Sequence, residues 1–560
     1  GVNDGLIPRH DAGGGILSEY DREELERADA KLSPTARETM YQQKFHLYRN
    51  LTKPSERLYL SFAKAGASGE AQNPSYLINE IRKLFPEILV RDIEKEENPE
   101  EKLEMPRSGE ALFLEELGKA AEGEMNPLFE ELYRWYAAHP EAGIPAETYR
   151  KAAFLRCADG VIGRSAASAL YGDTLKNSAT RLEKYAACAF AHFMEFGLQI
   201  RDRDQYELKA ADMGTVMHEA LEKFSKKLQE NGETWKTVGD DTRDRLIEEC
   251  VEETMADYGN TIFQSSSRNQ YRIIRVKRIL KRTVWALQQQ IRQGEFEPGE
   301  FEVSFSMEDS LSAINIDLSE HEKMRLRGRI DRVDLCETDD KVYVKIIDYK
   351  TGNTTFDLVS IYYGLQMQLV VYMRAAMQIE KKRHPDKNII PAGLLYYNID
   401  NPIVELDSTA SDLPDDGTSV EKMIFEALAM KGVVNCDGNI IKNMDSSDVK
   451  KSDVIPVSYK KDGTIDSRSH ILNTDQFISL DNYIAKKTSD VGKKIYSGAD
   501  KINPYKDGNY SSCSYCPYNE VCGFSQNLGN IKFRQIQKFD DAQLWENIKE
   551  GVDEDGSKLD

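Results

Sequence analysis

The sequence has no long apolar run, few cysteines and fewer basic than acidic residues. No apolar stretch approaches the ~20 residues that a membrane-spanning helix needs, and the start shows no signal peptide. Eight cysteines in 560 residues are too few for a disulfide scaffold. The 74 basic and 95 acidic residues give a net charge of −21, which argues against a protein that coats nucleic acid through bulk electrostatics. Together these absences predict a cytoplasmic protein.

A phosphate-binding P-loop is absent as well. The Gly-Lys pairs at 118–119 and 492–493 are not followed by Ser or Thr, so we expect no ATPase activity from this chain alone. The composition, with 40% hydrophobic and 30% charged residues, is that of a globular protein and excludes a disordered chain. At ~150 residues per domain, the length predicts two to four domains. The chain begins at Gly1 inside a loop-like stretch, so we expect it to be a piece of a longer protein.

The spacing of apolar residues predicts an α/β fold in which helices flank a mixed sheet. Residues 1–100 predict a truncated α/β segment, with a strand over 58–62 and an amphipathic helix over 74–85. Residues 101–175 predict a helical linker, 176–535 the main domain, and 536–560 an acidic tail with a frayed end. Within the main domain, helices are expected over 181–196, 214–228, 240–293, 362–379 and 475–497, strands over 301–305, 324–336, 342–350 and 392–399, and loops over 405–470.

Two aspartates and a lysine make the most informative pattern. Asp331 lies in one predicted strand, Asp348 closes the next, and Lys350 follows two residues later on the same face of that strand. Two carboxylates on adjacent strands form an oxygen site suited to Mg²⁺ or Mn²⁺. A lysine beside them can orient a water and neutralise charge on a phosphate, which is the equipment of metal-assisted phosphodiester hydrolysis. Asp334 is expected to face the opposite side of its strand and ranks lower.

The alternative for this pattern is a surface hairpin with solvated charges. Ile346 and Ile347 run directly into Asp348 and count against it, because a charge at the end of a buried strand needs a partner. His218 is a second candidate, in a predicted helix beside Met217 and Phe224. Taken alone, a helical histidine is more often structural.

These elements share their order with a known family. The motif G-x3-H-x2-L-E around His218, then GRIDRVD, DYKTG and Gln368-x3-Tyr372, resembles the RecB-type nucleases of the PD-(D/E)xK superfamily. The resemblance implies that His218, Asp331, Asp348 and the Tyr349 main-chain carbonyl bind metal and that Lys350 is catalytic. It also implies that Gln368 and Tyr372 lie on a helix bordering the active site and DNA, although an ordinary amphipathic helix explains that pair equally well.

Three clustered cysteines, Cys513, Cys516 and Cys522, indicate a metal site that is one ligand short of a closed tetrahedron. Sequence does not separate zinc from an iron–sulfur cluster. Some nucleases of the same class resemble this arrangement, with one cysteine before the core and three after it. The resemblance implies a structural [4Fe–4S] cluster held by Cys188 and the trio, which joins the two ends of the domain as a staple.

The amino-terminal stretches 1–9 and 48–63 resemble the last motifs of superfamily 1 helicases. A Thr-Arg-Ala sequence is expected there in active members, but this chain has Thr52-Lys53-Pro54, and Lys does not replace Arg at a bidentate phosphate site. The whole chain is similar to the carboxyl-terminal half of AddB-type subunits of bacterial helicase–nucleases. That similarity implies processing of double-stranded DNA ends for recombinational repair, cleavage of the 5′-ended strand, and an AddA-type partner subunit that supplies translocation.

A basic stretch, 268–282, has seven basic residues and no acidic one. Arg268, Arg272, Arg275 and Arg282 recur near helical spacing and predict a DNA-binding stripe. The alternative is a solvated helix face that pairs with neighbouring acids. The sequence as a whole therefore predicts an Mg²⁺-dependent deoxyribonuclease, and the competing hypotheses are a non-catalytic DNA-holding and partner-docking module, or a zinc protein with no nuclease role.

Overall fold

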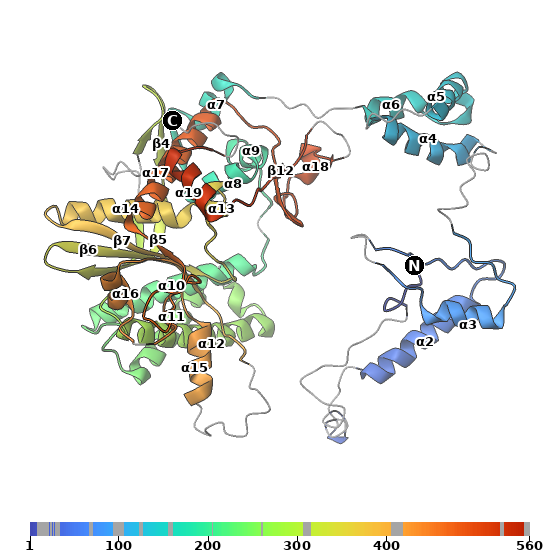
Figure 1. Ribbon diagram of the computed structural model, residues 1–560. Helices are drawn as coiled ribbons and strands as arrows, with labels where there is room; N and C mark the ends of the chain where they lie inside the picture. Colours follow the sequence, from blue (N-terminus) through green and yellow to red (C-terminus); the bar gives the residue numbers. More distant parts are fainter. Residues whose placement is uncertain are drawn as a thin grey trace. The chain divides into compact units, whose positions relative to one another are not determined.

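The chain is described from a computed structural model (Figure 1). The structure describes residues 1–7, 22, 25, 27–28, 34–66, 71–92, 103, 106–121, 127–154, 161–203, 205–258, 261–305, 315–404, 418–447, 449–526 and 531–553. They form two compact units, Gly1–Leu112 and Phe113–Asp560. No helix among these residues is long and apolar enough to cross a membrane.

The first unit contains two well-capped helices. Helix α2 (Ala36–Thr52) begins with a capping box between Thr35 and Glu38, and α3 (Tyr76–Leu84) begins at a Ser75 cap. Helix α3 confirms the amphipathic helix predicted over 74–85. The strand predicted over 58–62 is wrong: among the described residues the segment belongs to no strand ladder, and it contacts residue 2 through a single backbone hydrogen bond from Val2 N to the Ser61 carbonyl at 2.6 Å.

Helices make up most of the described part of residues 101–175, as the sequence predicted. The helices are α4 (Pro106–Ala121), which crosses the boundary between the two units, and the shorter α5 (Pro127–Ala138), α6 (Ala146–Ala153) and α7 (Arg164–Tyr171). In the second unit, Phe113 lies against Phe129 and Tyr136, so an aromatic cluster joins α4 to α5.

A six-stranded mixed sheet forms the centre of the second unit. Its spatial order is β2 (Glu297–Phe305), β5 (Gly328–Glu337), β6 (Lys341–Lys350), β7 (Asn388–Asn398), β8 (Lys431–Asn435) and β9 (Ile471–Leu472). The β6–β7 and β8–β9 pairs are parallel, and the other neighbours are antiparallel. The chain crosses from β6 to β7 through α14 (Gln368–Arg383), which is the helix-containing connection that a parallel pair requires.

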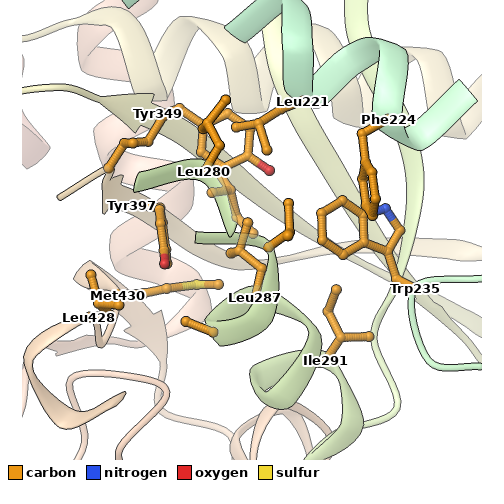
Figure 2. Packing of buried hydrophobic residues seen from close by; sticks show 14 of the residues in the cluster. Leu221, Phe224, Trp235, Leu280, Leu287, Ile291, Tyr349, Tyr397, Leu428 and Met430 are labelled. Carbon is orange, nitrogen blue, oxygen red and sulfur yellow. The ribbon is translucent and has the colours of Figure 1, made fainter. Parts of the chain in front are cut away.

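Helices cover both faces of this sheet (Figure 1). On one face lie α8 (Ala179–Ala187), α14, α17 (Thr474–Tyr496) and α19 (Asp541–Glu550), and on the other α10 (Ala210–Glu230), α11 (Asp240–Asp257), α12 (Ser267–Arg292) and α16 (Gly438–Met444). Strand β6 shows why two cores form, because its side chains alternate: Val344 and Ile346 join the first cluster, and Ile347 and Tyr349 the second. Figure 2 shows the second cluster, which contains Leu280 and Leu287 of α12 together with Tyr349 and Tyr397.

Several predicted elements are divided in the structure. The strand predicted over 324–336 is two strands, β4 (Lys323–Leu326) and β5, in different sheets. The helix predicted over 362–379 is broken at Gly364, whose φ of 74° ends α13 (Leu358–Tyr362) before α14 begins. The helix predicted over 240–293 is α11 and α12, separated by a short 3₁₀ turn (Ile262–Gln264).

The region predicted as loops, 405–470, holds regular structure that the sequence pattern did not predict. It contains α15 (Thr418–Ala427), β8 and α16, and β8 joins the central sheet. The end of the chain also differs from the predicted acidic tail. Leu544 and Ile548 of α19 are buried against the core, and Asp553 is buried in an ion pair with Lys487 at 2.5 Å. Residues 554–560 lie outside the described residues.

Two small sheets complete the domain. Strand β1 (Thr174–Asn177) pairs in parallel with β4, which also pairs with β3 (Asn315–Asp317). The other sheet joins β10 (Tyr505–Asp507), β11 (Tyr510–Ser511) and β12 (Arg534–Gln535). Helix α8 and the residues just after it also contact this carboxyl-terminal part. The Tyr185 hydroxyl of α8 donates to the Ala499 carbonyl at 2.8 Å, and Ala189 N, at the start of α9 (Ala189–His192), donates to Asn503 Oδ1 at 2.7 Å.

Candidate active site

The candidate site lies where β5 and β6 part. Their ladder runs from Glu337–Val342 to Arg332–Ile347 and ends there, so Asp331 and Asp348 stand just beyond the last pair. The amide of Tyr349 bridges the opening by donating to Asp331 Oδ2 at 2.8 Å. The structure thus brings the two predicted carboxylates together at the ends of two adjacent strands.

His218 reaches the same place from α10, which covers the second core. Its Nδ1 lies 3.4 Å from Asp331 Oδ2, and its ring meets the Tyr349 ring edge-on at 5.9 Å. Burial alone lowers the pKa of His218, but the hydrogen bond and charge of Asp331 outweigh it, so the pKa is raised above its ordinary value. His218 is therefore a neighbour of the carboxylates and not an isolated structural histidine.

Glu302 is a member of this site that the sequence pattern did not predict. It lies in β2 between the register pairs Phe301–Arg332 and Val303–Ile330, which places it opposite Asp331. Ligand atoms of Glu302, His218 and Asp331 lie within 4.8 Å of one another, a spacing that can hold a metal ion. Burial, and then the charge of Asp331, raise the pKa of Glu302 to about 7. Its carboxylate also forms an ion pair with Arg329.

Lys350 lies on the Asp348 side of the opening, as the strand alternation predicted. Its Nζ is 2.6 Å from Asp348 Oδ2 and donates to Gln368 Oε1 at 2.9 Å. Asp348 is 1% exposed, and burial together with the charge of Asp331 raises its pKa to about 6. The raised pKa means that the surrounding residues balance the negative charge of Asp348 only in part. A cation bound beside Asp348 would balance the rest of that charge.

Gln368 and Tyr372 continue this chain of contacts along α14. Gln368 Nε2 donates to the Tyr372 hydroxyl at 3.0 Å, while its carbonyl oxygen accepts from Lys350. Burial raises the pKa of Tyr372 to about 12, so the hydroxyl stays protonated. The two residues thus contact the site through Lys350 and are more than the apolar face of an amphipathic helix.

Asp334 lies on the opposite face, as expected from its spacing. It is buried between Arg332, whose Nε and Nη2 donate to it at 2.5 and 2.8 Å, and Lys345 at 2.9 Å. Trp235 and Phe301 lie under the Arg332 guanidinium at 5.6 and 5.9 Å. These charges compensate one another inside the second core, so Asp334 belongs to the packing of β5 and β6 and not to the candidate metal site.

The four predicted cluster ligands lie near one another. Cys188 ends α8 with an extended backbone (φ −166°, ψ 117°), so the helix predicted over 181–196 is interrupted there. Burial raises the pKa of Cys513 to about 11, and the neighbouring thiols of Cys188, Cys516 and Cys522 add to this effect. Residues 188 and 516 also pack around Tyr518, with Ala191 and Met194.

The predicted DNA-binding stripe on α12 is divided. Arg268 and Arg275 are exposed, whereas Arg272 donates to the Leu208 carbonyl at 3.5 Å and Arg282 lies over the Trp285 ring at 5.2 Å. Two lysines of the same helix pair with acids of α11, Lys277 with Glu252 and Lys281 with Glu248. Part of the stretch is therefore a paired helix face, and its exposed arginines remain candidates for DNA contact.

A model of the PD-(D/E)XK nuclease superfamily matches residues 176–523, a span that includes every side chain of the site. The chain belongs to this superfamily. Membership confirms the predicted family, and the matched range includes the parted ends of β5 and β6 with Asp331, Asp348 and Lys350.

Curated relatives of this superfamily member match nearly all of the chain. A protein of Lachnoclostridium phytofermentans is 40% identical over 98% of the chain and 47% of its own length, and one of Alkaliphilus metalliredigens 34% over 98% and 48%. One of Clostridium acetobutylicum is 33% identical over 100% and 48%. Each is named as the B subunit of an ATP-dependent helicase/deoxyribonuclease. The chain spans about half the length of these relatives.

Proposed function

We propose that the chain is the metal-dependent nuclease part of an AddB-type subunit of a DNA helicase–nuclease. The observation that carries this proposal is the meeting of His218, Glu302, Asp331, Asp348 and Lys350 at the parted strand ends. Phosphodiester hydrolysis needs a divalent cation and a group that neutralises phosphate charge, and this set offers both. Membership in a nuclease superfamily supports the same reaction.

The donor set fits Mg²⁺ or Mn²⁺, because it offers several carboxylate oxygens and one imidazole. We assign His218, Asp331, Asp348 and the main-chain carbonyl of Tyr349 as ligands and add Glu302. A bound ion would polarise the scissile phosphate and make water a better nucleophile. The raised pKa values of Glu302 and Asp348, about 7 and about 6, fit carboxylates that gain stability when a cation joins them.

Three side chains of the protein orient the reaction in this proposal. The Lys350 ammonium, between Asp348 and Gln368, orients the attacking water and neutralises charge on the phosphate. Gln368 fixes that ammonium through its carbonyl oxygen, and the Tyr372 hydroxyl fixes the Gln368 amide. The exposed Arg268 and Arg275 contact phosphates of the bound strand, with Arg272 and Arg282 beside them.

A structural [4Fe–4S] cluster on Cys188, Cys513, Cys516 and Cys522 is also part of the proposal. What supports a shared group is the proximity of the four thiols, because Cys188, Cys516 and Cys522 each add to the raised pKa of Cys513.

The complete protein, in this proposal, processes double-stranded DNA ends for recombinational repair and cuts the 5′-ended strand as an exonuclease. An AddA-type subunit supplies ATP-driven translocation, because this chain has no P-loop. The name of the relatives, which makes each the B subunit of a helicase/deoxyribonuclease, supports an assembly of this kind.

The test is a cleavage assay on end-labelled duplex and single-stranded DNA with Mg²⁺, on this chain with and without the partner subunit. Asp348→Ala should abolish cleavage and leave the fold intact. Asp340→Ala is the matched control, because Asp340 is exposed at the opposite end of the same hairpin. Labels at the 5′ and 3′ ends in separate reactions reveal the strand that is cut.

Full cleavage by Asp348→Ala would overturn the active-site assignment. Binding of DNA without cleavage by either form, even with the partner subunit present, would favour the DNA-holding module instead. Loss of cleavage in Asp340→Ala as well would show that the assay reports folding and not the site.

A further inference from the structure

Helix α8 places a carboxylate at the beginning of α14, next to the candidate site. Glu183 Oε1 accepts hydrogen bonds from two successive backbone amides, Met367 N at 2.7 Å and Gln368 N at 3.0 Å. The first amides of a helix have no partner within the helix, and a carboxylate there also interacts favourably with the helix dipole. A usual N-cap side chain belongs to the residue just before the helix, whereas Glu183 precedes Met367 by 184 residues and belongs to α8.

The capped end of α14 is the end that contacts Lys350. Gln368 is the first residue of α14, and its side chain accepts from Lys350 Nζ, while its backbone amide donates to Glu183. A shift of this end therefore moves the Gln368 carbonyl oxygen away from the ammonium. The N-cap residue itself, Met367, forms no side-chain hydrogen bond and cannot take over this part.

We propose that Glu183 is a positioning residue for the nuclease reaction, which fixes the first turn of α14 and through Gln368 the catalytic Lys350. The inference rests on the proposed function, because it assigns Glu183 a part in the same site. Neither the family model nor the names of the relatives gives this residue a role. Its position explains why a polar side chain lies on the inner side of α8, between the buried Leu182 and Tyr185 and their neighbours in the first core.

The two hydrogen bonds, and not the charge, are the elements that position the helix. Both bonds end on one oxygen, Oε1, so the amide oxygen of a glutamine can accept both in the same place. Glu183→Gln should therefore keep the geometry, and Glu183→Ala should lose it. A side chain that merely filled space would tolerate Glu183→Met, which has a similar volume and no acceptor oxygen.

The experiment measures single-turnover cleavage of end-labelled DNA by the purified chain, with the partner subunit if the wild type needs it. We expect Glu183→Ala and Glu183→Met to lower the single-turnover rate constant at saturating enzyme about tenfold, with the enzyme concentration that gives half the maximal rate unchanged. Glu183→Gln should stay within about threefold of the wild type. Glu195→Gln serves as a control, because Glu195 pairs with Lys184, the neighbour of Glu183 on α8.

A double-mutant cycle separates positioning from general stability. In a Gln368→Ala background the Glu183 substitutions should lower the cleavage rate constant less than twofold, because the hydrogen bond from Lys350 to the Gln368 side chain is already missing. The same tenfold loss in that background, or wild-type rates in Glu183→Met, would overturn the inference. A wild type that never cleaves DNA would instead overturn the proposed function, so the two failures are distinct. If Glu183→Ala does not fold, the Met and Gln variants decide.

Discussion

Two buried aspartates of adjacent strands, Asp334 and Asp348, differ in what surrounds them. Asp334 lies between Arg332 and Lys345, and these cations lower its pKa in spite of burial. Asp348 has one cation, Lys350, and a second carboxylate nearby, so its pKa is raised to about 6. The same residue type is therefore part of the packing in one place and of a cation site in the other.

The sequence predicts that Asp334 lies on the face opposite the candidate site. It does not predict that Glu302 belongs to that site. Side chains alternate along a strand, so Asp331 and Asp334 had to face opposite sides. In FEVSF the same alternation sets Glu302 apart from the apolar Phe301 and Val303 and gives no sign of a buried partner. What places Glu302 beside Asp331 is the antiparallel register of β2 with β5, which the sequence does not reveal before the two strands are paired.

Replacing Asp334 should lower the free energy of unfolding more than replacing Asp348 does. Asp334→Asn leaves Arg332 and Lys345 as buried cations without a counter-charge, which should cost about 3 kcal/mol or more of unfolding free energy. Asp348→Asn removes a carboxylate that repels Asp331, and stability should change by about 1 kcal/mol or less. Urea denaturation at pH 7.5 measures both, and equal losses would contradict the division.

His192 should make the protein sensitive to mild acid. It is 2% exposed among Tyr171, Tyr185 and Phe196, and burial, with Arg181 and Lys184 nearby, lowers its pKa to about 3. The pKa of histidine in an unfolded chain is ~6.5, so below that pH the unfolded chain binds a proton at residue 192 that the native chain does not bind. Stability therefore falls as the pH drops from about 6.5 toward 3.

The measurement compares unfolding free energies at pH 7.0 and 5.5. His192→Phe should reduce the difference between the two by about 1 kcal/mol, because the unfolded-state proton is gone. The exposed His321→Phe should leave the difference unchanged. An unchanged difference in His192→Phe would show that other groups cause the acid sensitivity.

At the scale of elements, helix and strand types followed from apolar spacing, while their ends depended on single residues and on partners. Helix α17 and strands β6 and β7 match the predicted ranges closely because their patterns are long and regular. The break at Gly364 requires a positive φ that only the structure reveals. Strand β8, KGVVN, is too short to be recognised alone and forms because β7 offers an edge to pair with.

The exposed arginines of α12 should govern DNA affinity more than sequence preference. Arg268→Glu with Arg275→Glu should weaken binding and lower the slope of log affinity against log salt by about 1 for each phosphate that is no longer neutralised. Fluorescence anisotropy on single-stranded DNA at several salt concentrations measures this slope. Arg245→Glu on α11 is the control, and an effect of equal size there would contradict a specific track.

At the scale of the whole molecule, a set of contacts joins residues 185–189, near the start of the nuclease domain, to residues after 498, near its end. Tyr185 and Ala189 bond to residues 499 and 503, and Cys188 lies beside the carboxyl-terminal cysteines. The net charge of −21 is compatible with DNA binding at such a domain, because charge acts locally and part of the acidic excess lies in the candidate metal site. Bulk composition excluded a coating protein and said little about an enzyme.

Loss of one cluster ligand should loosen both ends of the domain together. Cys516→Ser should remove the visible absorbance and the iron of anaerobically purified protein, and should expose the segments around 185–200 and 499–524 to protease. Cys250→Ser, at a buried cysteine of the second core away from the trio, is the control. Colourless wild-type protein with stoichiometric zinc would contradict the iron–sulfur assignment.

The tie between α8 and the carboxyl-terminal segment also sets an order of events during synthesis. The Tyr185 hydroxyl and the Ala499 carbonyl are 314 residues apart in the chain. At ~5–20 residues per second a ribosome needs roughly 15 to 60 s to make that stretch, and strand β7, which follows the last of the candidate catalytic residues, is complete well before its end. A nascent chain therefore holds all its candidate catalytic side chains for several seconds before α8, which carries Glu183, gains its carboxyl-terminal support. The contacts of Tyr185 and Ala189 with residues 499 and 503 are therefore among the last in this domain that can form during synthesis.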